Sequence, residues 1–240
     1  MLSKLHVPYL PVLTPKHKRP KDLHPLLPLP KDLFAIFYGG VGSGKTQAML
    51  NLVLRSQQYR DFYPGGIYVF SPTAEHDDST RPLRESSDVH LLGPYSDEKC
   101  MQLFKELEEA VDKAKEEGDE PLPSLLVMDD CVGDIKEYSQ VATEVLRHRH
   151  RHCGVIILTQ LWKGIPTKFR ANASMVYLFK VRDDQEMKKI QEAMGSTFGN
   201  LSSLMARAHQ EPHDFLLLFQ GRCPKTQAWR NFCQELLYEA

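Results

Sequence analysis

The residues with the clearest chemical meaning form a loop that matches the pattern G-x-x-x-x-G-K-[ST], namely Gly39, Gly40, Val41, Gly42, Ser43, Gly44, Lys45 and Thr46. Glycines let such a loop turn its backbone N–H groups inward around phosphate oxygens. A helix that begins where the loop ends also favours anions. The Lys45 ammonium would then reach the β- and γ-phosphates, and the Thr46 hydroxyl would bind Mg²⁺. The loop therefore predicts a binding site for ATP and Mg²⁺.

The segments on either side of the loop have the pattern that such a site needs. Residues 33–38 form a short apolar run typical of a strand, and residues 46–60 carry apolar side chains at helical spacing. The alternative is a glycine-rich turn without function. Because Gly makes up about 7% of ordinary residues, a chance match to the pattern is on the order of a few per cent. The order strand, loop, helix makes the nucleotide site the favoured interpretation.

Two further strand ends carry side chains suited to ATP hydrolysis. Asp129 and Asp130 follow the apolar run 124–128, and Gln160 follows the run 154–158. A carboxylate at Asp129 would hold the same Mg²⁺ as Thr46. Asp130 would act as the base that activates water, and the Gln160 amide would position that water and sense the γ-phosphate. The alternative for the two acids is a strand that ends in a polar turn.

Strand-like and helix-like segments alternate along the rest of the chain. Further strands are expected at 66–71, 89–92 and 175–181, a closing hairpin at 214–219 and 226–230, and helices at 96–117, 137–148, 183–194 (opened by a capping box) and 198–209. Such alternation predicts an α/β fold with a mostly parallel central sheet and helices on both faces. Ligands of such sheets bind at the carboxyl ends of the strands.

Composition limits the classes of protein to which the chain can belong. A chain of 240 residues with 42% apolar residues fits one domain, expected at 31–240. The net charge of −1 gives no strong overall attraction to nucleic acid, so DNA contacts must come from local patches. Five scattered cysteines argue against a disulfide framework. No apolar run is long enough to span a membrane, and we expect no membrane partner.

Residues 1–30 are expected to form a proline-rich arm that lies on the core or on a neighbour. The prolines are unlike a secretory signal, so the chain is not expected to be secreted. A basic cluster at residues 16–21 would contact phosphates or act in nuclear import; a solvated linker is the alternative.

Residues 147–152 alternate Arg and His directly before a buried strand. One interpretation is an arginine that completes the ATP site of a neighbouring subunit, a second is contact with DNA phosphates, and a third is a solvated basic face. Metal binding by the histidines and Cys153 ranks last, because i, i+2 spacing divides ligands between helix faces. Arg170 is a second candidate cation.

The order of these features resembles the viral genome-packaging ATPases of the FtsK/HerA type, found in poxviruses, other large DNA viruses and virophages. The resemblance extends over about residues 34–194. It rests on the glycine-rich loop, an inserted strand, Asp129-Asp130, Arg149-His150 before Thr159-Gln160, and Ile165-Pro166 followed by Arg170 and Asn172. It implies a P-loop NTPase fold of the additional-strand type, with Asp130 where the family usually has glutamate.

The resemblance also implies a function. A homo-oligomeric ring would hydrolyse ATP to drive double-stranded DNA, without sequence specificity, into a preformed capsid, with Arg149 or Arg170 acting in trans and a capsid vertex protein as a further partner. The expected location is the virion or the infected host cell. The alternatives are a mobilisation ATPase of a transposon or plasmid, a nucleotide kinase, and a weakly hydrolysing protein that binds DNA or capsid.

Overall fold

A computed structural model describes residues 19–54, 58–181, 183–221 and 227–236. Its strands form one sheet in the order β3-β2-β4-β5-β1-β6-β7-β8-β9. In chain order they are β1 Phe34–Tyr38, β2 Ile67–Phe70, β3 Val89–Gly93, β4 Ser124–Asp129, β5 Cys153–Thr159, β6 Met175–Phe179, β7 Phe215–Phe219, β8 Gln227–Arg230 and β9 Gln234–Leu236. The helices are α1 Lys45–Leu54, α2 Arg81–Arg84, α3 Asp97–Glu117, α4 Gln140–Leu146, α5 Thr167–Asn172, α6 Asp184–Phe198 and α7 Leu201–Ala208.

The strand order has the feature that defines the additional-strand type of P-loop fold. Strand β5 lies between β1, which leads into the glycine-rich loop, and β4, which ends at Asp129. The strands from β3 to β6 are all parallel, so their carboxyl ends meet at one edge of the sheet. Strands β7, β8 and β9 continue the sheet antiparallel. The predicted mostly parallel sheet and the closing hairpin are confirmed, and β9 is an addition to the prediction.

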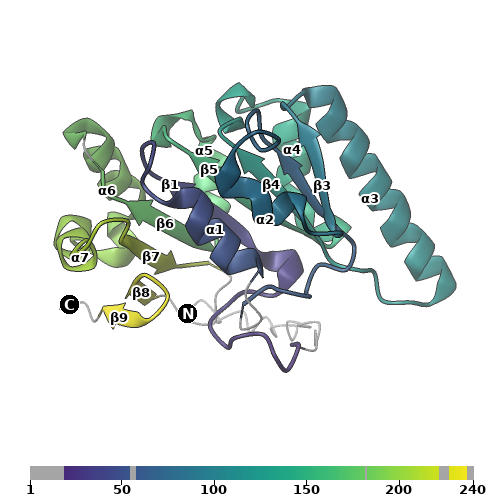
Figure 1. Cartoon of the computed structure of the whole chain (residues 1–240), viewed down its shortest axis with the longest axis horizontal. Helices are drawn as coiled ribbons and strands as arrows, with labels where there is room; N and C mark the ends of the chain where they lie inside the picture. Colours follow the sequence, from purple (N-terminus) through teal and green to yellow (C-terminus); the bar gives the residue numbers. More distant parts are fainter. Residues whose placement is uncertain (1–18, 55–57, 182, 222–226, 237–240) are drawn as a thin grey trace, which may run out of the picture.

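Helices cover both faces of the sheet, as predicted. One face packs against α1 and α2, together with Leu23 and Leu27 from the segment expected to be an arm. The other face packs against α3 to α7. Figure 1 shows α3 toward the β3 end of the sheet and α6 and α7 beside β6 and β7. Residues 1–18 of the predicted arm, which include residues 16–18 of its basic cluster, lie outside the described residues.

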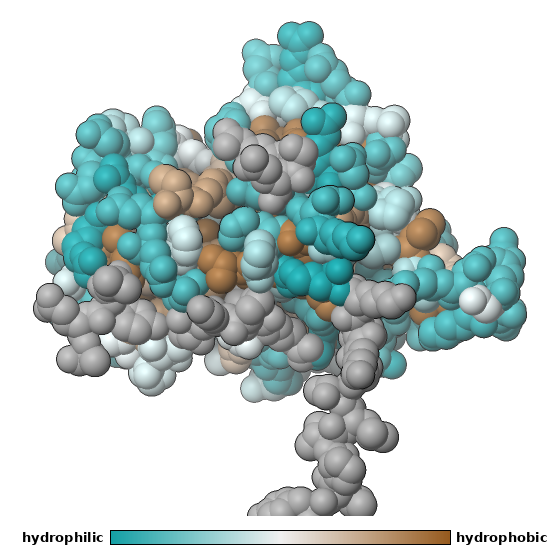
Figure 2. All heavy atoms as spheres, turned by 90° about the horizontal axis from the view of Figure 1, so that it is seen from below, coloured by the Kyte–Doolittle hydropathy of each residue, from teal (hydrophilic) through white to brown (hydrophobic). Residues whose placement is uncertain are grey.

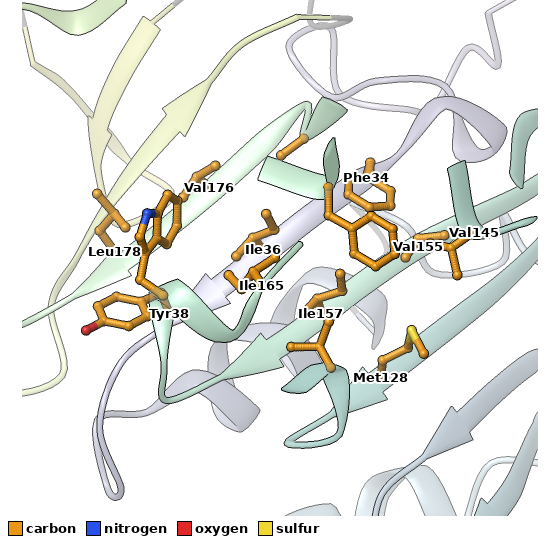
Figure 3. Close-up of a cluster of buried hydrophobic side chains, with 14 of the residues drawn as sticks. Phe34, Ile36, Tyr38, Met128, Val145, Val155, Ile157, Ile165, Val176 and Leu178 are labelled. Atoms are coloured by element: carbon orange, nitrogen blue, oxygen red, sulfur yellow. The ribbon is translucent and has the colours of Figure 1, made fainter. Parts of the chain in front are cut away.

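The core beneath the second set of helices is made of alternate side chains from neighbouring strands. Figure 3 shows Phe34, Ile36 and Tyr38 of β1 beside residues of β5 and β6, with Val145 of α4 next to Val155 of β5. Inner strands that are buried on both faces have continuous apolar sequences rather than alternating ones. This burial holds β1, β5 and β4 in register and thereby sets the positions of the residues that follow each strand.

Several predicted boundaries differ from the structure. Helix α1 ends at Leu54, whereas residues 46–60 were expected to be helical; 55–57 lie outside the described residues. Helix α4 begins only at Gln140, because the Ser139 side chain accepts a hydrogen bond from Ala142 N and caps it there. The capping box expected at 183–186 is wrong. Asp183 caps α6, but Glu186 turns away and accepts a hydrogen bond from Trp162 N.

The surface has no large apolar area on the face drawn in Figure 2, where small apolar patches are scattered among hydrophilic residues and the far end of α3 projects at the right. Within the described part of the chain, no helix combines the length and the apolar character needed to cross a membrane.

Candidate active site

The glycine-rich loop connects β1 to α1 at the carboxyl edge of the sheet. Gly42 and Gly44 have φ angles of 70° and 99°, which L side chains rarely adopt. Gly39 is needed for a different reason, because a Cβ there would lie 2.6 Å from Phe179 Cβ. Among the described residues the buried Ser43 hydroxyl has no hydrogen-bond partner. A loop of this shape with an unused hydroxyl fits a phosphate ligand.

Lys45 points back into the loop that precedes it. Its Nζ donates hydrogen bonds to Gly39 O at 2.8 Å and to Gly40 O at 3.1 Å, and the residue is only 8% exposed. Burial lowers the pKa of the Lys45 ammonium, and the negative charges of Asp130 and Asp129 oppose that shift. Two carbonyl groups are weak compensation for a buried cation. A phosphate group would be a stronger partner, and the ammonium is placed to receive it.

Asp129 is the last residue of β4, and its carboxylate is oriented by a neighbouring strand. Ser71, directly after β2, donates a hydrogen bond from Oγ to Asp129 Oδ2 at 2.9 Å. Burial raises the pKa of the Asp129 carboxyl and Asp130 adds to the rise, whereas the Ser71 hydrogen bond and the Lys45 ammonium lower it.

The carboxylate of Asp129 and the hydroxyl of Thr46 are oxygen donors of the kind that Mg²⁺ prefers. The described residues contain no cluster of three or more His, Cys, Asp or Glu side chains able to hold a metal. One carboxylate and one hydroxyl therefore fit an ion that takes its other ligands from water and phosphate, as Mg²⁺ does in NTP sites.

Asp130 and Gln160 contact each other across two neighbouring strands. Gln160 Nε2 donates a hydrogen bond to Asp130 Oδ2 at 2.7 Å. Asp130 has a positive φ of 47° and donates its backbone N–H to Leu158 O of β5. Both side chains are exposed, so they meet water at the edge where the glycine-rich loop also lies. The structure thus brings together Lys45, Asp129, Asp130 and Gln160 at the ends of adjacent strands.

A cavity of about 750 Å³ extends from the glycine-rich loop toward the far side of β1. Its walls include the loop from Gly40 to Ser43, Tyr38, Lys180 and residues 209–214. The segment 209–214 is held at both ends, because the His209 ring bonds to Leu178 O and the Asp214 carboxylate accepts from Gln210 N and Glu211 N. Gln160, which bonds to Asp130, also lines this cavity, so the cavity joins the Asp130–Gln160 pair to the segment 209–214 across the glycine-rich loop.

The alternating Arg and His residues lie at the amino end of β5, the edge of the sheet away from the glycine-rich loop. Arg151 is 5% exposed and forms ion pairs with Glu144 and Glu108. His148 is buried and bonds to Cys153 O. Arg149 is partly exposed in the short helix of residues 148–151. Arg151 and His148 are therefore structural, and Arg149 remains the candidate within this segment for contact with another molecule.

Arg170 lies in α5, on the face of the sheet that carries Trp162. Its guanidinium carbon is 5.8 Å from the centroid of a Trp162 ring, and its NH2 donates to Thr167 Oγ1. The structure therefore separates the two candidate arginines, with Arg149 at the amino edge of β5 and Arg170 on the helix that leads into β6.

A sequence model of the poxvirus A32 protein family matches residues 28–208, which span the glycine-rich loop, Asp129-Asp130 and Gln160. The chain belongs to this family. The resemblance to viral packaging ATPases that the sequence suggested is thereby confirmed. No curated protein sequence matches this A32-family chain at a significant level.

Solved structures show the same fold as this A32-family chain. The genome packaging NTPase B204 from Sulfolobus turreted icosahedral virus 2 in complex with AMP aligns with a TM-score of 0.61 at 13% identity, over 84% of this chain and 97% of that one. The DNA-packaging ATPase B204 from Sulfolobus turreted icosahedral virus aligns at 0.55 with 17% identity, over 78% and 92%. EssC (ATPases 2 and 3) from Geobacillus thermodenitrificans aligns at 0.57 with 15% identity, over 92% and 47%.

Three contributors to the site of this A32-family chain were not found from its sequence. Ser71, which orients Asp129, had a signal in its position at the end of a predicted strand. His213 had none; a Cβ added at Gly44 would lie 3.3 Å from His213 Cβ, so this residue closely approaches the glycine-rich loop. Glu137 was assigned to a helix, but its carboxylate instead accepts hydrogen bonds from Thr167 N and Lys168 N at the start of α5.

Proposed function

We propose that the chain is an ATP hydrolase that moves double-stranded DNA into a preformed viral capsid as part of a homo-oligomeric ring. One observation carries the proposal, namely the hydrogen bond between Gln160 and Asp130 beside Lys45 and Asp129 at the carboxyl edge of the sheet. A binding protein needs the glycine-rich loop alone, whereas a carboxylate and an amide placed together beyond it suit the activation of water. Membership of the A32 family and a fold shared with genome-packaging NTPases support the same function.

The reaction proposed for this site is the attack of water on the γ-phosphorus of ATP. Asp130 accepts a proton from the water as the new P–O bond forms, and Gln160 holds the water in line. The bond to the β,γ-bridging oxygen breaks, and its electron pair leaves with ADP. Lys45 moves from the carbonyls of Gly39 and Gly40 to the phosphate oxygens and stabilises their negative charge. Thr46 and Asp129 would hold a bound Mg²⁺, which would supply further positive charge to the phosphates.

A cation from a neighbouring subunit would complete the site in a ring. Arg149 and Arg170 are the two candidates: Arg149 lies at the amino end of β5, away from this subunit's own glycine-rich loop, and Arg170 lies in α5 beside Trp162. Such an arginine contributes roughly 10³–10⁵-fold to the rate in related reactions. Replacing Arg149 and Arg170 by Ala one at a time identifies the residue, because only the trans-acting one lowers hydrolysis in the assembled ring while leaving ATP affinity intact.

The partners proposed are double-stranded DNA, bound without sequence specificity, other copies of the chain, and a protein of the capsid vertex. DNA contacts that drive movement must tolerate every sequence, and contacts to the phosphate backbone satisfy that requirement. The virion and the infected host cell are the proposed locations.

Steady-state ATP hydrolysis with and without double-stranded DNA tests the proposal, alongside the mass of the assembly in solution. We expect DNA to stimulate phosphate release by the wild-type protein and Lys45→Ala to abolish it. Transfer of phosphate to a nucleoside, in place of release to water, would instead identify a nucleotide kinase. Turnover that is unaffected by Lys45→Ala contradicts the proposal.

A further inference from the structure

Two loops leave the catalytic strands side by side. The first comprises residues 131–139 after Asp130, and the second comprises residues 161–168 after Gln160; together they are called the paired loops below. Two hydrogen-bonded connections join them. One is the hydrogen bond from Gln160 to Asp130 at their base. The other is the Glu137 carboxylate, whose Oε2 accepts from Thr167 N at 2.7 Å and whose Oε1 accepts from Lys168 N at 3.3 Å.

The connection through Glu137 is expected to hold the two loops together as a rigid unit. Its carboxylate satisfies two N–H groups at the start of α5, where helices lack internal partners and negative charge is favourable. The loops also approach each other between the two connections, since a Cβ added at Gly164 would lie 3.9 Å from Gly133 Cα. A displacement of one loop would therefore move the other and act on the Asp130–Gln160 pair.

The exposed surface of the paired loops is basic and carries an aromatic ring. Tyr138 is 85% exposed, and Lys168 Nζ lies 4.8 Å from the centroid of its ring. Lys136 and Lys163 are also exposed. Asp134 is an exposed acidic residue of the paired loops, whereas the Glu137 carboxylate accepts a hydrogen bond from the backbone of α5.

The lysines of the paired loops differ from those of α3 in their partners. On α3, Lys105 pairs with Glu109, Lys113 with Glu117, and Lys115 with Asp112. By contrast, within the described residues no carboxylate lies within ion-pair distance of the three loop lysines. The three exposed lysines of the paired loops are therefore available for an anionic partner.

We propose that the paired loops bind the phosphate backbone of double-stranded DNA through Lys136, Lys163 and Lys168, and that Glu137 transmits this contact to Asp130 and Gln160. The inference rests on the proposed function, and it identifies the paired loops as the surface that binds DNA. Lysines act as point charges on phosphates and read no sequence, which suits a motor. Glu137 is a positioning residue, because it touches neither DNA nor ATP.

A triple variant, Lys136→Ala with Lys163→Ala and Lys168→Ala, tests the contact. The matched control is Lys105→Ala with Lys113→Ala and Lys115→Ala, which removes the same charge from α3. Each phosphate contact contributes about 0.9 to the slope of log affinity against log salt. We expect the loop variant to bind a DNA duplex about tenfold or more weaker, with a slope smaller by about 2–3, and the α3 control to bind as the wild type does.

The outcomes separate this inference from the proposed function. If the wild-type protein binds no DNA in fluorescence anisotropy, the proposed function fails. If the wild-type protein binds DNA and the loop variant binds it equally well, the inference fails while the function stands. Loss of affinity in the α3 control to the same extent as in the loop variant would also overturn the inference, because net charge alone would then explain the binding.

Glu137→Ala tests the transmission, with Glu137→Gln as the conservative variant that keeps a hydrogen-bond acceptor. The measurement is the ratio of ATP hydrolysis with saturating DNA to that without it, together with DNA affinity and Tm. We expect Glu137→Ala to bind DNA with near wild-type affinity while its stimulation ratio falls toward one, and Glu137→Gln to lie between. Full stimulation in Glu137→Ala, or a loss of stimulation that only follows a loss of DNA affinity or of folding, contradicts the role.

Discussion

Two buried cations in this chain are compensated in opposite ways. Arg151 forms ion pairs with two carboxylates, and its guanidinium carbon lies 5.3 Å from the centroid of the Phe104 ring. Lys45 instead donates its hydrogen bonds to two carbonyls of its own loop, and Asp130 and Asp129 act on it without forming an ion pair. A buried charge with carboxylate partners stabilises a fold only as long as the pair is intact. A buried ammonium without them is held ready for an anionic ligand. Arg151 therefore has a structural role, whereas the charge of Lys45 is available for a ligand.

Arg151→Ala is expected to lower the free energy of unfolding by about 3–5 kcal/mol, because it removes the buried cation of Glu144 and leaves that carboxylate with the exposed Arg147 alone. Arg147→Ala is the control from the same segment. Arg147 pairs with Glu144 from an exposed position, and its loss is expected to cost about 0.5 kcal/mol. Urea unfolding of the two variants checks the prediction; similar losses in both would show that the Arg-His segment is a solvated basic face throughout.

Lys45→Ala is expected to abolish stabilisation by ATP while leaving the ligand-free protein at least as stable as the wild type. The reason is that the substitution removes a cation whose burial lowers its pKa, against the opposing charges of Asp130 and Asp129, and whose hydrogen bonds go to backbone carbonyls. A ligand at 100 times its Kd stabilises the folded state by about 2.7 kcal/mol. Thermal unfolding with and without MgATP measures both effects, and an unchanged shift in Tm for the variant would contradict the role of Lys45.

At the scale of elements, local patterns and long-range contacts differ in how far they can be predicted. The glycine-rich loop, Asp129 and Gln160 are local features at strand ends, and parallel pairing brings strand ends together without further information. Glu137 shows the limit. Its apolar neighbours and helix formers favoured a helix from 137, but Ser139 caps α4 later, and Glu137 instead caps α5, thirty residues away in sequence. A contact between segments that are distant in sequence produces no periodic pattern in the sequence from which it could be predicted.

The segment 209–214 allows a prediction about how the stability of the fold depends on pH. Burial lowers the pKa of His209, and its hydrogen bond to Leu178 O opposes that shift. A lowered pKa means that the unfolded chain binds the proton more readily, so stability is present above the usual value of about 6.5 and is lost as pH falls through it. Two neighbouring charges also act on the His209 ring: Asp214 raises its pKa and Lys180 lowers it.

His209→Gln can still donate a hydrogen bond to Leu178 O but does not titrate. We therefore expect the Tm of the wild type to fall more steeply than that of the variant between neutral and mildly acidic pH. Differential scanning fluorimetry across this range measures the difference. Parallel curves would show that the ring is not held in its neutral form.

Across the whole molecule, the sheet order explains why the site lies where it does. The insertion of β5 between β1 and β4 places Gln160 between the glycine-rich loop and the Asp129-Asp130 pair. The alternation of strands and helices predicted this layered fold, because apolar runs of strand length must be buried between helices. The added strand β9 was not predicted, since three residues with two exposed side chains have no apolar pattern.

The central claim is that Lys45, Thr46 and Asp129 together bind ATP with Mg²⁺, and calorimetric titration of the purified chain with ATP tests it most directly. The account predicts measurable affinity in the presence of Mg²⁺, a large loss when Mg²⁺ is chelated, and a comparable loss in Asp129→Ala with Mg²⁺ present. Equal affinity with and without Mg²⁺, or no affinity for ATP at all, would contradict it.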